Sequence, residues 1–116
     1  MTFPDIETTT QPPVNLTRQK RQLAEQAIAQ AAASQWADAA ETNRKLIELG
    51  QDAEAENRLA KALWELGELA NAREHYQTAL ALDPTNRIAE RNIDWLKVLL
   101  VLLGLIVVAW NRQALG

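Results

Sequence analysis

The sequence contains no cysteine and only one histidine, and it is poor in glycine, proline and aromatic residues. Without cysteine there is no disulfide, no thiolate nucleophile and no cysteine-based metal site. Lysine and arginine together number 12 against 15 acidic residues, a net charge of −3. This balance provides no basic surface for nucleic acid, so we expect no nucleic-acid partner.

Catalytic motifs are missing as well. There is no glycine-rich loop that would hold a phosphate and no metal-ligand spacing. The single histidine, His75, is interpreted as a packing or surface residue, because the sequence places no nucleophile or carboxylate obviously around it. We therefore predict no catalytic residue, no cofactor, no metal site and no small-molecule substrate, and a protein that is not an enzyme.

The first 15 residues differ from the rest in composition. They lack the basic and apolar regions of a secretory signal, so we expect none here. Three prolines and a run of threonines predict a disordered arm over residues 1–15. Phe3 and Ile6 offer a short docking motif as the alternative.

From Asn15, a candidate N-cap, apolar residues follow a helical period, and no segment alternates like a half-buried strand. Gly50 and Gly67 suit helix ends, and Asp83 before Pro84 stops a helix. The sequence therefore predicts an all-α fold. The expected helices cover residues 16–33, 35–49, 53–66, 69–82 and 86–112.

Two stretches of the chain repeat the same pattern. Residues 34–50 slide onto 67–83, which is a shift of 33 residues. Each has a small residue at the turn, a bulky one two positions later and alanine three beyond that. The aligned pairs are Ser34 with Gly67, Trp36 with Leu69, Ala39 with Ala72, Ile47 with Leu80 and Leu49 with Leu82. A small side chain where two backbones approach allows an antiparallel helix pair to pack closely.

The second stretch resembles the tetratricopeptide repeat (TPR) family. The matching residues are Leu59, Ala60, Leu63, Gly67, Ala72, Tyr76, Ala79 and Pro84. The first unit, about residues 20–53, departs from the pattern at Asn43 (usually aromatic), Leu46 (usually alanine) and Gln51 (usually proline). A third unit only begins, with Ile88, Ile93 and Leu96 available for packing. The resemblance implies two TPR-like antiparallel helix pairs and a binding module; a bare three-helix bundle with accidental repeat character is the alternative.

By this resemblance, the first helix of each pair lines a concave groove. In the second unit that face presents Asn57, Arg58, Lys61 and Trp64. Arg58 and Lys61 can pair with carboxylates, and Trp64 offers a flat apolar surface to a peptide; simple solvation of the two cations is the alternative. Ala24 and Ile28 occupy the positions where the family's carboxylate clamp needs lysine and asparagine. Recognition of chaperone tails is therefore not expected.

The last region, residues 98–110, carries no charged, hydroxyl or amide side chain and holds ten Leu, Ile and Val. A helix that is apolar on every side has no use in a small soluble domain. Trp95 and Trp110 bracket the run, as aromatic residues do at membrane interfaces, and Lys97 and Arg112 can snorkel outward. We predict that the capping helix of the repeats continues as a transmembrane segment. Its residues include Trp95, Val98, Leu99, Leu102, Gly104, Leu105, Ile106, Val108 and Trp110.

Two other environments stay open for this helix, namely burial in a partner or homo-oligomer and an interfacial position. Three basic residues, Arg87, Arg91 and Lys97, precede the run and only Arg112 follows it. The positive-inside rule then predicts a cytoplasmic repeat domain and a C-terminus on the opposite side of a single-pass membrane protein.

The predicted organisation is therefore a disordered arm (1–15), a repeat domain with its capping helix (16–97), a transmembrane segment (98–110) and a short tail (111–116). We expect a tail-anchored interaction module, scaffold or small accessory subunit of a membrane protein complex. Its partners would be proteins, including other transmembrane helices, and the lipid bilayer. The alternative is a soluble TPR-like structural protein whose apolar C-terminal helix mediates homo-oligomerisation or is buried in a partner.

Overall fold

The fold is all-α, as predicted. The computed structural model describes residues 14–115, and within that range it consists of five helices and no strand. The helices are α1 (Val14–Ala32), α2 (Trp36–Glu48), α3 (Ala53–Glu65), α4 (Leu69–Leu82) and α5 (Arg87–Leu115).

The start of α1 corrects two predictions. Because the helix begins at Val14, Asn15 lies inside it and is not the N-cap. The predicted boundary of the N-terminal arm at residue 15 is accordingly too late, since residues 14 and 15 are helical. The rest of that predicted arm, residues 1–13, lies outside the described residues.

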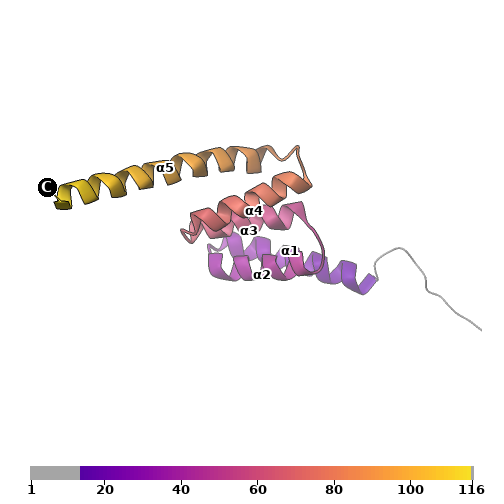
Figure 1. Cartoon of the computed structure of the whole chain (residues 1–116). Coiled ribbons are helices and arrows are strands. Elements are labelled where there is room, and N and C mark those ends of the chain that lie inside the picture. Colours follow the sequence, from indigo (N-terminus) through magenta and orange to yellow (C-terminus); the bar gives the residue numbers. More distant parts are fainter. Residues whose placement is uncertain (1–13, 116) are drawn as a thin grey trace, which may run out of the picture.

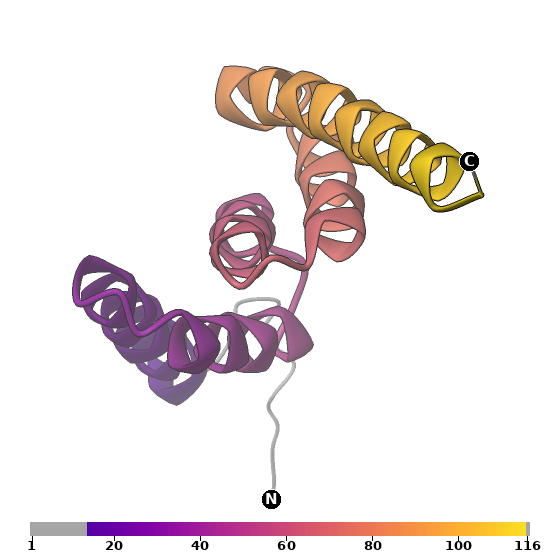
Figure 2. The ribbon, with the colours of Figure 1, turned by 90° about the vertical axis from the view of Figure 1, so that its left-hand side faces the viewer.

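The helices form a stack in chain order. α1 and α2 make one antiparallel pair, α3 and α4 make the next, and α5 lies on α4 (Figures 1 and 2). One apolar core runs through the stack, and seven of its twelve buried members are alanine. Alanine lets neighbouring helices approach closely, while a few large side chains fill the remaining volume. The largest apolar or aromatic side chains that are fully buried are Tyr76, Leu46, Leu59, Leu63 and Leu96.

The turn within each helix pair uses a left-handed residue at the same register position. Gly67 has φ +83° between α3 and α4, and Ser34 has φ +59° between α1 and α2. Glycine adopts this conformation without steric cost, whereas serine does not. Other helix starts have ordinary caps: the Asp52 carboxylate accepts from the Ala55 amide at 3.0 Å, and the Asn86 side chain accepts from the Ala89 amide at 3.0 Å.

α5 divides into two parts with different surroundings. Ala89, Ile93 and Leu96 are buried, whereas Ile88, which was predicted to pack, is 53% exposed. The helix continues unbroken beyond Leu96, and its C-terminal part projects past the ends of the other helices (Figure 1). α5 is the one described helix that is long and apolar enough to cross a membrane.

Candidate functional site

A groove of about 430 Å³ opens where α3 faces the end of α1 and the start of α5. The sequence of the third, unfinished unit thus supplies one wall of the groove. The residues that line it are Ala31, Trp36, Asn57, Arg58, Lys61, Tyr76, Ile88, Arg91 and Asn92.

Three of the four predicted groove residues, Asn57, Arg58 and Lys61, line this groove together. The fourth, Trp64, is absent from its lining and instead packs edge-on against Tyr76, with ring centroids 6.4 Å apart and an interplanar angle of 84°. Trp36 of the first hairpin, α1–α2, lines the groove in place of Trp64. The repeat register identified Trp36 only as a packing residue, so sequence reasoning did not place it here.

The two predicted cations are held differently. Arg58 is held by two neighbours, because its Nε donates to Asn43 Oδ1 at 3.1 Å and its guanidinium lies 3.7 Å from the Glu54 carboxylate. Lys61 lies on the surface, with its Nζ 3.5 Å from Glu65. The same Nζ stands 5.9 Å from the Trp36 ring centroid and 6.0 Å from that of Trp64. At such distances the rings attract the ammonium group, which keeps Lys61 over the groove.

The opposite wall adds a third cation and polar groups. Arg91 of α5 lines the groove and makes no ion pair within residues 14–115.

The Oδ1 atom of Asn57 is buried and accepts no hydrogen bond from any described residue. Burial raises the pKa of Tyr76, a hydrogen bond with Asn92 opposes this shift, and the nearby Glu65 charge adds to it. The groove is thus cationic and partly aromatic.

His75 has a neighbour that the sequence did not reveal. Its Nδ1 lies 2.7 Å from Glu56 Oε2, so the prediction that no carboxylate adjoins His75 is wrong. Glu56 directly precedes the groove residue Asn57 in α3, and it is only 7% exposed. The pair joins α3 to α4 inside the second hairpin, on residues that do not line the groove. No group that could act as a nucleophile is hydrogen-bonded to it in the described part of the chain.

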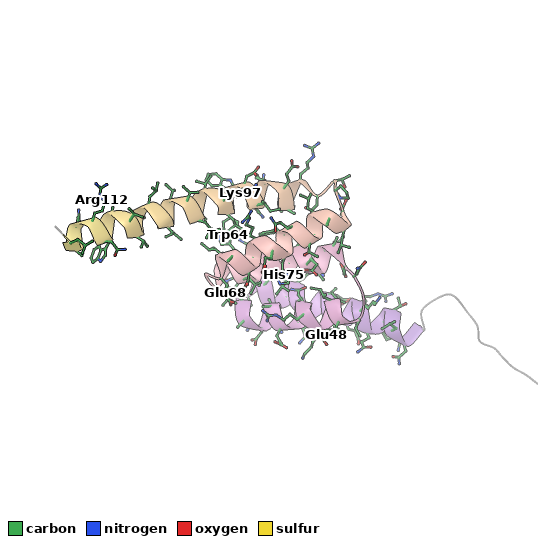
Figure 3. The ribbon with its side chains drawn as sticks, in the orientation of Figure 1. Glu48, Trp64, Glu68, His75, Lys97 and Arg112 are labelled. Atoms are coloured by element: carbon green, nitrogen blue, oxygen red, sulfur yellow. The ribbon has the colours of Figure 1, made fainter. Side chains whose placement is uncertain are left out.

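The apolar part of α5 forms a second candidate site. Its large side chains are 48–72% exposed from Val98 to Trp110, apart from the half-buried Leu99 and Leu100. Lys97 and Arg112 lie near its two ends (Figure 3). Gly104 has open space where a Cβ would be, so nothing among residues 14–115 contacts that side of the helix.

Comparison with known proteins identifies the second hairpin. Residues 53–86 match the family model of the tetratricopeptide repeat. No curated protein matches the chain. The hairpin α3–α4 is therefore similar to a tetratricopeptide repeat, a kind of unit that typically serves as a non-enzymatic module for protein–protein interaction.

Proposed function

We propose that this protein is a membrane-attached, non-enzymatic module that holds an acidic, extended segment of a partner protein in its groove. Residues 16–97 would form the repeat domain, 98–110 the membrane segment and 111–116 a short tail. The observation that carries the proposal is one helix with two roles: α5 supplies a wall of the groove and then continues as a fully apolar, exposed rod.

The chemistry of the groove favours a partner that carries carboxylates. Lys61 of α3 and Arg91 of α5 line the groove from different helices, and Arg58 of α3 is already held by Asn43 and Glu54. Trp36 provides an apolar surface beside the cations.

Charge reversal of both walls tests the groove. A fluorescein-labelled decapeptide of alternating Glu and Leu should bind the full chain, and its Lys and Leu counterpart should not. Lys61→Glu with Arg91→Glu should reduce the affinity about 10-fold or more, since opposed charges at an interface cost on the order of kcal/mol. The control, Arg44→Glu with Lys45→Glu, makes the same charge change on exposed residues of α2. Equal binding by both double variants would exclude this groove as the docking surface.

The exposed apolar helix favours attachment to a bilayer. Ten Leu, Ile and Val at roughly −0.3 to −0.6 kcal/mol each favour insertion by about 3–6 kcal/mol. Residues 98–110 span about 20 Å and the hydrocarbon core of a bilayer is about 30 Å thick, so local thinning and snorkelling of Lys97 and Arg112 would complete the span. The basic residues before the run favour a cytoplasmic repeat domain and a C-terminus across the membrane.

The rigid junction supports a role as a fixed subunit of a membrane assembly. α5 runs without interruption from the groove wall into the apolar segment, so no flexible linker separates binding from attachment. A repeat domain held at constant height and tilt suits a scaffold or accessory subunit, with other transmembrane helices beside Gly104.

Membrane fractionation with alkaline extraction tests the attachment. The full chain should stay in the membrane pellet after extraction, and a version that ends at Lys97 should be released. If the full chain is released as well, the membrane segment is wrong. Sedimentation equilibrium of that released chain would then reveal the alternative, an oligomer assembled through α5.

A further inference from the structure

The corner between α3 and α4 lies against the apolar part of α5. Gly67, Glu68 and Asn71, with the intervening first residues of α4, form one side of a crevice, and Leu100 and Leu103 form the other. Figure 3 shows Glu68 at the end of the repeat domain from which α5 projects, and Glu48 toward the opposite end. The corner therefore stands beside the first half of the run that we assign to the membrane.

The position of the corner along α5 is fixed. α5 is a single helix from Arg87 to Leu115 without proline, and Ala89, Ile93 and Leu96 anchor its first part in the core. Any layer of lipid that covers the exposed side of Leu100 and Leu103 therefore meets the corner at the same depth.

Lengths and charges restrict that depth. From Leu103 to Arg112 the helix rises only about 14 Å, which is less than half of a hydrocarbon core of about 30 Å. Hydrocarbon that began at Leu103 or beyond would therefore leave Arg112 no farther than the centre of the bilayer, where a charge is costly. If it began well before Val98, Glu68 and Asn71 would be immersed. A start near Val98 instead places Arg112 about 21 Å along the helix, within reach of the far headgroups by snorkelling and local thinning, and leaves the corner beside Leu100 and Leu103 at the near boundary between hydrocarbon and headgroups.

We propose that the α3–α4 corner, Leu66–Asn71, is a second membrane-contact surface that rests among the lipid headgroups. This inference depends on the proposed membrane attachment. Leu66 is apolar and 42% exposed at the tip of the corner, where it can contact the upper acyl region. Glu68 and its neighbour Glu65 are acidic, so the corner favours zwitterionic headgroups, whose ammonium groups they can approach, over anionic ones.

Single-cysteine labelling tests the contact directly, because the chain has no cysteine of its own. The full chain is reconstituted in phosphatidylcholine vesicles with an environment-sensitive nitrobenzoxadiazole dye on Asn71→Cys, Glu48→Cys or Ile106→Cys. Asn71 and Glu48 are both exposed in the protein. The dye at position 71 should shift to the blue and lose quenching by iodide, as at position 106, whereas position 48 should remain quenched as in water.

Charge reversal gives a second, independent readout. Glu68→Lys should increase binding to vesicles that contain phosphatidylserine about 5- to 30-fold, as one or two charges near an anionic surface would. Glu48→Lys makes the same change of net charge, but a site more than a Debye length of about 8–10 Å from the surface should have little effect. Glu68→Gln should give an intermediate increase.

The outcomes separate the two proposals. If position 106 is shielded, position 71 behaves like position 48 and the two lysine variants bind alike, the corner does not touch the membrane and this inference is overturned. Failure of position 106 to be shielded would reject the membrane attachment itself. Circular dichroism of each variant checks that the helices are intact.

Discussion

The two helical hairpins have the same backbone design but different side chains. With a shift of 33 residues, α1–α2 falls on α3–α4, and the left-handed turn residue Ser34 falls on Gly67. Only the second hairpin matches the tetratricopeptide repeat model. The first hairpin is nevertheless an antiparallel helix pair that packs against the second, so the fold tolerates large departures from the family pattern.

Paired changes of volume explain this tolerance. Asn43 replaces the large aromatic of the pattern, and Leu46 replaces the small alanine three residues later; Tyr76 and Ala79 hold these places in the second hairpin. All four are at most 2% exposed. The volume lost where Asn43 replaces the aromatic residue is thus regained where Leu46 replaces alanine, which is what a close-packed core requires. A repeat can lose its signature while it keeps its packing.

Replacing Tyr76 and its counterpart Asn43 by alanine should give the largest difference in stability loss between the two hairpins. Tyr76→Ala is expected to lower the free energy of unfolding by about 3–5 kcal/mol, because the cavity lies in the shared core. Asn43→Ala should cost about 1–3 kcal/mol, since it removes two hydrogen bonds, to Arg58 and to the Ala39 carbonyl, but little volume. Urea unfolding in mild detergent, followed by circular dichroism, measures both.

Equal losses in these two variants would contradict the volume argument. They would mean that the Asn43 network, and not the neighbouring Leu46, holds the first hairpin together. Leu46→Ala distinguishes the cases: with compensation by volume it should cost about 2–5 kcal/mol, close to the loss for Tyr76→Ala.

Each hairpin has a polar contact between its two helices, and removing this contact should have the next largest effect on stability. His75 contacts Glu56 at 2.7 Å, and Thr42, at the same register position of the first hairpin, donates to Gln30 at 2.7 Å. His75→Ala should destabilise by about 1–3 kcal/mol because the carboxylate of Glu56 is left buried without its partner. Thr42→Ala leaves a neutral amide and should cost less. A larger loss for Thr42→Ala in the same unfolding assay would reverse this ranking.

The sequence predicted the helices to within one or two residues at most ends because helical period, Gly67 and Asp83–Pro84 are local signals. It also placed Asn57, Arg58 and Lys61 on one face. It missed the groove contribution of Trp36 and the contact of His75 with Glu56, because both depend on how one helix is rotated against another. Ile88 was assigned to the core for its hydrophobicity alone, yet it lines the groove, since α5 turns Ala89 and not Ile88 toward α4.

Alkaline pH should weaken the second hairpin selectively. The pKa of Tyr76 is raised above its ordinary value of 10.0 by burial, so around pH 10 and above this tyrosine loses its proton more readily in the unfolded chain than in the folded one. The unfolded state then binds fewer protons, and the free energy of unfolding falls as pH rises, by at most about 1.4 kcal/mol per pH unit. Tyr76→Phe should reduce this slope, although other groups titrate equally in both proteins. Identical slopes from pH 9.5 to 11 in urea unfolding would show that Tyr76 is not responsible.

The smallest expected effect comes from exchanging the turn residues. Ser34 pays a steric cost at φ +59° that glycine avoids, so Ser34→Gly should stabilise the first hairpin by about 0.5–1 kcal/mol, after allowance for the greater freedom of glycine in the unfolded chain. Gly67→Ala should destabilise the second hairpin by about 1–2 kcal/mol at φ +83°, even though a Cβ there would meet no other atom within 4 Å. Because the space is open, any loss in Gly67→Ala arises from the backbone alone. A stabilising Gly67→Ala would therefore mean that the turn can leave the left-handed region, and that the shared conformation of the two hairpins is not required for their packing.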